Sequence, residues 1–126
     1  MITGIGVDLC EIERIREATS RHGDQFAQRI LANDERTEFD GLSQSIQAAF
    51  LAKRFAAKEA VAKALGTGIG RGFGFHDITI THDKLGKPIV SLNTENPALK
   101  EALSYRIHLS ISDERTHAIA FCTIEA

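Results

Sequence analysis

The chain has 126 residues, of which 43% are hydrophobic and 25% charged, and its formal net charge is −2. This length predicts a single domain, residues 1–126, and the composition excludes disordered and fibrous classes. A nearly balanced charge argues against a general nucleic-acid-binding protein. No apolar run reaches the roughly 18 residues of a membrane span, and residues 1–9 lack the basic start of a signal peptide. Two cysteines form no disulfide framework, so we expect a reduced, cytoplasmic protein without nucleic-acid or membrane partners.

The first half of the chain is predicted to hold one short strand followed by helices. β-forming residues favour a strand over residues 1–9, and apolar positions at helical spacing favour the helices after it. These helices span residues 11–21, 24–31, 34–40 and 45–65. Gly23 and Gly66 are expected to end the first and last helix, and Asn33 and Ser45 to cap the third and fourth. The last helix is the longest, and its alanine-rich apolar stripe makes it the central one.

The second half of the chain changes to the period-two pattern of strands, after a glycine-rich loop over residues 66–75. Strands are predicted at residues 76–83, 88–93, 106–112 and 116–125, with the last two forming a hairpin. Asn96 and Pro97 are expected to start a helix that runs to about residue 103. The predicted class is therefore α+β, with N-terminal helices and one long central helix packed on a largely antiparallel sheet.

Basic side chains concentrate on the central helix and the glycine-rich loop. The segment from residue 50 to residue 72 has a single acid, Glu59, and five bases, which are Lys53, Arg54, Lys58, Lys63 and Arg71. Glycine backbone and cationic side chains together suit a phosphate or pyrophosphate ligand. The alternative is an ordinary solvated helix face. The loop follows a helix and lacks a Gly-Lys-Ser/Thr ending, which argues against nucleoside-triphosphate and dinucleotide motifs.

Two acids are candidates for holding a hard cation such as Mg²⁺, which takes one or two carboxylates together with phosphate oxygens and water. Glu59 lies among small and apolar residues, with Lys63 one helical turn later to reach a phosphate. The alternative for Glu59 is a simple ion pair with Lys63. Asp8, at the end of the first strand, is the candidate second carboxylate, and its alternative role is the N-cap of the first helix.

Two more polar groups have both a functional and an ordinary interpretation. His108, Ser110 and Ser112 share one face of the strand over residues 106–112, which is either a solvent face or the polar wall of a binding site. Arg14 and Arg21 share one side of the first helix, either as surface arginines or as a docking patch for an acidic partner. The histidine and cysteine spacing gives little support for a zinc site.

Four motifs in order resemble bacterial holo-[acyl-carrier-protein] synthases, of the 4′-phosphopantetheinyl transferase superfamily, over essentially the whole chain. They are GIGVDLCEIERI at residues 4–15, FAAKEAVAKALGTGIGRG at 55–72, LGKP at 85–88 and HLSISDE at 108–114. The resemblance implies that family's fold. It also implies transfer of 4′-phosphopantetheine from coenzyme A to a serine of apo-acyl carrier protein, giving holo-acyl carrier protein and adenosine 3′,5′-bisphosphate, for fatty acid biosynthesis.

The resemblance also implies roles for individual residues. Asp8 and Glu59 match the family's two metal-binding acids, with Mg²⁺ as the expected ion, and Lys63 matches a lysine near the reacting phosphate. The coenzyme A site is matched by Arg54, Lys63, Gly66, Gly68 and His108.

For partners, the resemblance implies acyl carrier protein, docked on the Arg14 and Arg21 face, and a homotrimer with active sites at subunit interfaces. Asp113 stands where relatives carry a second histidine, so no role is carried over to it. The competing hypothesis is a non-catalytic module that binds coenzyme A or another polyphosphate.

Overall fold

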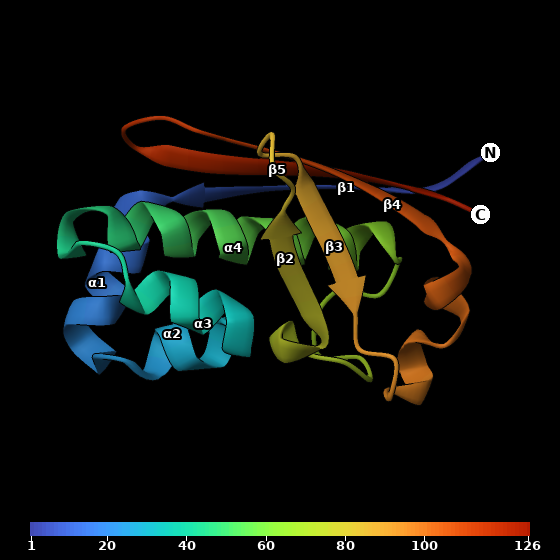
Figure 1. Ribbon diagram of the computed structural model, residues 1–126, viewed down its shortest axis with the longest axis horizontal. Helices are drawn as coiled ribbons and strands as arrows, with labels where there is room; N and C mark the ends of the chain where they lie inside the picture. The colour runs from blue at the N-terminus through green and yellow to red at the C-terminus, as the bar shows by residue number, and fades with distance from the viewer.

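The long helix α4, Gln44–Ala64, lies at the centre of the molecule between a sheet and a layer of shorter elements (Figure 1). A computed structural model describes residues 1–126. The N-terminal half holds strand β1, Ile2–Glu11, and helices α1, Ile12–His22, α2, Gln25–Ile30, and α3, Asn33–Asp40. The second half holds strands β2, Ile78–His82, β3, Pro88–Leu92, β4, Arg106–Asp113, and β5, His117–Glu125. None of the helices combines the length and apolar character that crossing a bilayer requires.

Two antiparallel sheets confirm the predicted α+β class. The larger sheet has the strand order β1-β5-β4, so the N-terminal strand pairs with the C-terminal hairpin, with Asp8 opposite Ala120. The smaller sheet is the separate hairpin β2-β3, which crosses α4 in Figure 1 while α1, α2 and α3 lie together near the N-terminal part of α4. The edges of the larger sheet are therefore β1 and β4, with β5 between them.

Two glycines allow β1 to lie directly against α4. A Cβ atom at Gly4 would overlap the carbonyl oxygen of Ala64, and one at Gly6 would overlap that of Ala60. Since any larger residue would push strand and helix apart, the Gly-x-Gly pattern permits this close approach. The next residue on the same face of β1 is Asp8, which the packing brings to the side of α4.

The helix α4 is buried on more sides than its predicted apolar stripe indicates. The stripe residues Ala57, Ala60, Val61 and Ala64 are buried as predicted, but Ile46 is half exposed. Additional buried positions include Ala52, Ala56 and Ala62, because α4 is covered by the sheet on one side and by helices and the β2-β3 hairpin elsewhere. Three charged residues are also buried, namely Glu35, Arg54 and Lys58.

The two predicted N-caps of α3 and α4 are wrong. Asn33 is the first residue of α3, whose N-cap is Ala32, and the Glu35 carboxylate accepts the Ala32 N–H at 2.9 Å. This is the bond that the third helical residue makes in a capping box, and Ala32 has no side-chain oxygen to make the reciprocal one. Ser45 lies inside α4, where Ser43 takes the N-cap position.

Two other predicted elements also differ in the structure. Residues 75–77 form a 3₁₀ turn, so β2 begins only at Ile78. Residues 97–99 and 101–104 form two 3₁₀ turns instead of one helix. The predicted cap is nevertheless present there, because the Asn96 side chain accepts the Ala98 N–H at 2.9 Å.

Candidate functional site

Asp8, Glu59 and Lys63 come together where β1 lies against the C-terminal half of α4. The Lys63 ammonium donates to Asp8 Oδ1 at 3.0 Å and to the carbonyl oxygen of Val7 at 3.0 Å. Glu59 lies one turn before Lys63 on α4. Burial raises the pKa of Glu59, and the Asp8 charge raises it further, against the opposing effect of Lys63.

Both simple alternatives for these acids are wrong. The N-cap position of α1 is held by Glu11, because β1 continues three residues beyond Asp8. The ion pair of Lys63 is formed with Asp8 across two elements, and not with Glu59 within the helix. The three side chains therefore form one charged centre between strand and helix.

The donor set of this centre fits Mg²⁺ shared with a phosphate ligand. Asp8 Oδ2 is buried and has no hydrogen-bond partner, although an unpaired buried carboxylate oxygen is costly. No group of three or more histidine, cysteine or acidic side chains is placed so that it could hold a metal ion, so the protein alone offers no complete set of metal ligands. Two carboxylates are nonetheless what Mg²⁺ takes when phosphate and water supply the other oxygens.

A pocket of about 300 Å³ opens beside Asp8. Its walls come from β1, α1, α2 and α4, and they are mostly apolar. Arg14 and the rings of Phe26 and Phe55 line it, so α1 borders the charged centre directly. Arg21 is also exposed on α1, two turns after Arg14.

Arg54 lies on another side of α4, in a second pocket of about 300 Å³. This pocket is bordered by α3, α4, the β2-β3 hairpin and β4, and Lys53 and His82 also line it. The Arg54 side chain is only 3% exposed, and its guanidinium carbon lies 4.4 Å from the centre of the Phe50 ring. Its Nη2 donates to Glu38 Oε2 at 3.3 Å, while its Nη1 is buried without a partner.

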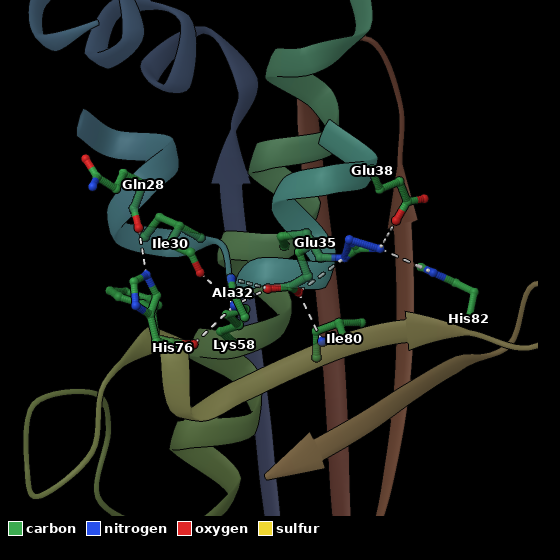
Figure 2. A network of polar contacts seen from close by, with 11 residues as sticks. Gln28, Ile30, Ala32, Glu35, Glu38, Lys58, His76, Ile80 and His82 are labelled. Atoms are coloured by element: carbon green, nitrogen blue, oxygen red, sulfur yellow. Dashed lines mark hydrogen bonds and ion pairs between the residues drawn. The ribbon is translucent and has the colours of Figure 1, made fainter. Parts of the chain in front are cut away.

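Glu35 and Lys58 form the centre of a buried polar cluster (Figure 2), and this cluster joins Arg54 to the rest of the fold. Glu35 accepts from the Ile80 N–H at 3.0 Å and from the Lys58 ammonium, and its Oε2 lies 3.7 Å from Arg54 Nε. Lys58 also donates to the carbonyl oxygens of Ile30 at 2.6 Å and Phe75 at 3.1 Å. The cluster thus ties α4 to the end of α2, to α3 and to the start of β2.

The charges of this cluster do not balance. Lys58 and Arg54 are two buried cations, and Glu35 is the one buried anion beside them. Burial lowers the pKa of both cations, and Glu35 opposes that effect. The other acid that pairs with Arg54 is Glu38, whose side chain is 56% exposed. The surplus positive charge therefore lies at Arg54, which lines the second pocket and has a buried Nη1 without a partner.

Sequence reasoning missed Glu35, Lys58 and His82. The interpretation of the basic segment as a solvated helix face is wrong for Arg54 and Lys58, which are both buried. A signal was present, because Lys58 follows Ala57 and lies one helical turn before Ala62, among small residues where a buried charge has to be paired. Its partner could not be identified, since Glu35 is 23 residues away.

His108 and the two loop glycines lie away from these groups. His108 is on the face of the sheet that points away from α4, with Nε2 2.6 Å from Glu125 Oε1. Gly66 and Gly68 follow α4 with positive φ angles of 89° and 74°. Their N–H groups donate to the carbonyl oxygens of Lys63 and Ala62, so they help to end the helix.

One chain does not bring all the predicted residues together. Arg54 and Glu59 are five residues apart on α4, which places them about 140° apart around the helix axis. The Asp8 centre lies at β1 and the Arg54 pocket at β4, the two opposite edges of the sheet. The structure thus places the Asp8 centre and the Arg54 pocket on different sides of the molecule.

The outer face of the larger sheet is unusually apolar. Ile5, Val7 and Leu9 on β1 are 64%, 50% and 63% exposed, and Ile119 and Phe121 on β5 are 42% and 43% exposed. The strand register places Val7 beside Phe121 and Leu9 beside Ile119, so these side chains form one continuous patch. Contiguous apolar surface of this kind is typical of an interface with another protein.

The sequence and the fold of the chain both match proteins of one known family. A holo-[acyl-carrier-protein] synthase of Vibrio cholerae serotype O1 is 53% identical over 126 residues, covering 99% of this chain and 98% of that relative. The crystal structure of holo-[acyl-carrier-protein] synthase from Neisseria meningitidis matches with a TM-score of 0.88 at 43% identity, covering 100% of both chains. That of a Bacillus anthracis holo-(acyl-carrier-protein) synthase in complex with CoA (3′,5′-ADP) matches with a TM-score of 0.85 at 42% identity, covering 100% of this chain and 98% of the other. The family model of the 4′-phosphopantetheinyl transferase superfamily matches residues 4–122, and the chain belongs to that superfamily.

Proposed function

We propose that the chain acts as a holo-[acyl-carrier-protein] synthase, which transfers 4′-phosphopantetheine from coenzyme A to a serine of apo-acyl carrier protein. The proteins of Vibrio cholerae and Neisseria meningitidis that carry this name match the chain over nearly its full length. The observation that carries the proposal is the centre of Asp8, Glu59 and Lys63, with its unpartnered buried Asp8 oxygen. A non-catalytic binding module has no need for two acids held together in this way.

The reaction exchanges the phosphoanhydride bond of the pyrophosphate for a phosphate ester to serine. The serine Oγ forms a bond to the phosphorus that carries pantetheine, and the bond from that phosphorus to the bridging pyrophosphate oxygen breaks. Adenosine 3′,5′-bisphosphate leaves with the bonding electron pair, and the serine proton passes to solvent. Such a transfer depends on positioning and on neutralisation of the charge on the phosphate oxygens.

Asp8 and Glu59 would hold Mg²⁺, which would supply positive charge at the pyrophosphate. Lys63 fixes Asp8 by donating to Oδ1, and this leaves Oδ2 directed away from the ammonium. The same ammonium adds a cation beside the reacting phosphate. The mostly apolar pocket next to Asp8 suits the pantetheine arm.

The Arg54 pocket is the proposed seat of the phosphorylated adenosine end of coenzyme A. Its buried cluster carries a surplus positive charge, and Nη1 of Arg54 is free to donate to an anion. A phosphate group bound there would balance the charge of the cluster. Gly66, Gly68 and His108 remain predicted contacts of the same substrate.

A homotrimer would bring two half-sites together, the Asp8 centre of one subunit and the Arg54 pocket of the next. The Asp8 centre and the Arg54 pocket lie near opposite edges of the sheet, so the β1 side of one subunit can complete its site with the β4 side of the next. A contact between two different surfaces repeats around a ring and closes it, here with three subunits. The apolar outer face of β1 and β5 would be covered at the centre of the ring.

Carrier protein would dock on α1, where exposed Arg14 and Arg21 lie beside the pocket that contains Asp8. The positive charge of this face complements an acidic carrier protein. We further propose a cytoplasmic enzyme of fatty acid biosynthesis, formed by one domain over residues 1–126. The two buried, unpaired cysteines are consistent with a reducing compartment.

The experiment that tests the function is mass spectrometry of apo-acyl carrier protein after incubation with the chain, coenzyme A and Mg²⁺. We expect the carrier protein to gain the mass of one phosphopantetheine group, and Asp8→Asn or Glu59→Gln to reduce the rate at least about 100-fold. Far-UV circular dichroism of both variants checks that they remain folded. Binding of coenzyme A that is indifferent to Mg²⁺, without modification of the carrier, would instead support the non-catalytic module.

A further inference from the structure

His82 stands at the end of β2 (Figure 2), and its side chain lines the Arg54 pocket. Its Nδ1 lies 3.4 Å from Nη2 of Arg54. A guanidinium has only donor groups, so Nδ1 must accept this hydrogen bond and cannot itself carry a proton. The imidazole in this arrangement is therefore neutral, with its proton on Nε2.

The charges around His82 agree with a neutral ring. Burial lowers the pKa of His82, Arg54 and Lys53 lower it further, and Glu38 and Asp83 oppose them. His82 also lines a smaller pocket of about 240 Å³ between α3 and β2. The charged groups that border the ring, this pocket or the Arg54 pocket come from every neighbouring element: Asp34, Glu35 and Glu38 of α3, Lys53 and Arg54 of α4, Asp83 after β2, and Asp113 of β4. The ring thus lies between the surplus cation of the buried cluster and a set of more exposed acids.

We propose that His82 is a ligand-binding residue of the Arg54 pocket, which gains a proton when a phosphate monoester binds there and then donates to the phosphate. The proposal rests on the proposed function, which places a phosphate of coenzyme A against Arg54. A phosphate dianion between Arg54 and His82 takes over the Arg54 donors, so Nδ1 no longer has to accept from the guanidinium. The dianion also reverses the local charge that keeps the ring neutral, and the proton comes from solvent.

The linkage has a definite sign. An unperturbed histidine has a pKa of about 6.5, and the His82 pKa lies below its usual value without ligand and rises when an anion binds. Binding therefore takes up a proton, and affinity falls by at most about tenfold per pH unit as pH rises through the pKa of the bound state. Because the phosphate itself loses its second proton near pH 6, the effect is best measured above about pH 7.

Isothermal titration calorimetry with adenosine 3′,5′-bisphosphate tests the proposal on the intact protein. Titrations at about pH 7 and about pH 8.5, each in two buffers of different ionisation enthalpy, give the affinity and the number of protons taken up. The wild type should take up a fraction of a proton at the lower pH and bind roughly threefold to tenfold more weakly at the higher one. His82→Gln keeps a hydrogen-bonding side chain but should lose both effects. The control His22→Gln, at the end of α1, should behave as the wild type.

Each outcome separates the two proposals. If His82→Gln and the wild type take up equal numbers of protons and share one pH dependence, the role of His82 is wrong while the transferase function stands. If the wild type binds no bisphosphate and leaves apo-carrier protein unmodified, the proposed function fails and takes the role of His82 with it. Bisphosphate binding whose proton uptake is lost in His82→Gln supports both the transferase function and the role of His82.

Discussion

The buried cluster around Glu35 makes an asymmetric prediction about stability. Replacing Glu35 with glutamine removes the one buried anion and leaves two buried cations, Lys58 and Arg54, facing each other. Replacing Lys58 with methionine leaves Glu35 still opposite Arg54 at 3.7 Å and still accepting the N–H groups of Ala32 and Ile80. Both variants disturb the same ion pair, but the first leaves uncompensated charge and the second does not.

The magnitudes follow from what each variant leaves behind. An uncompensated buried charge destabilises a protein by about 3–5 kcal/mol, which is the expected loss for Glu35→Gln. Lys58→Met leaves the carbonyl oxygens of Ile30 and Phe75 without their donor, at a cost of about 1–3 kcal/mol. Glu38→Gln is the matched control, because its side chain is 56% exposed and pairs with the same Arg54; its cost should stay below about 1 kcal/mol.

Urea unfolding followed by far-UV circular dichroism measures these losses, with every variant at the same protein concentration, since association contributes to apparent stability. The expected order of destabilisation is Glu35→Gln, then Lys58→Met, then Glu38→Gln. A Lys58→Met variant that is destabilised as much as Glu35→Gln would refute the reasoning that the cluster carries surplus positive charge.

Three further predictions concern β1, α1 and the turn before β2. Gly6→Ala should push β1 away from α4, lower the free energy of unfolding in urea by about 1–3 kcal/mol and reduce the transfer rate at saturating coenzyme A. The control Gly41→Ala has room for a methyl group and should change neither the stability nor the transfer rate. The double variant Arg14→Glu, Arg21→Glu should raise the KM for carrier protein and remove its dependence on ionic strength; unchanged kinetics would exclude this docking face. Burial alone would raise the pKa of Asp77, but hydrogen bonds from the Gly74 N–H and from Asn93 hold that pKa below its usual value. The ionised Asp77 therefore stabilises the fold above about pH 4, and this stabilisation is lost as pH falls through the lowered pKa. Asp77→Asn should be less stable than the wild type at neutral pH, and the difference in unfolding free energy should shrink in acid. A difference that does not change with pH would contradict this.

Local patterns predicted the elements well, because these depend on residues close in sequence. The extended motifs singled out Asp8, Glu59 and Lys63, which the structure brings together. The helical spacing of residues 45–65 and the alternation of residues 106–125 gave α4 and the last hairpin to within two residues at each end. The predicted caps were wrong because both helices begin earlier than predicted. Ala32 takes the N-cap position of α3, where the Glu35 carboxylate accepts the Ala32 N–H, and Ser43 takes the N-cap position of α4.

Contacts between distant segments were beyond the reach of sequence patterns. Periodicity can place Lys58 on a buried face, but it cannot show that Glu35 of α3 and the carbonyl groups of two other segments receive its three hydrogens. In the same way, the motif identified Asp8 and Lys63 without indicating that they pair with each other. The β1 strand carried a signal that was not used, since glycines and an acid face α4 while the apolar residues Ile5, Val7 and Leu9 face outward. That inverted pattern is what a strand covered by a neighbouring subunit would show.

The placement of Asp8 and Arg54 at opposite edges of the sheet has a genetic consequence. In the proposed ring, each site takes its acids from one subunit and its arginine from the next. A chain with Asp8→Asn and a chain with Arg54→Gln would each be inactive alone, yet together they would rebuild about one intact site in four in randomly mixed rings. Two defective alleles in one cell would then complement each other, whereas two alleles that both lack Asp8 never would.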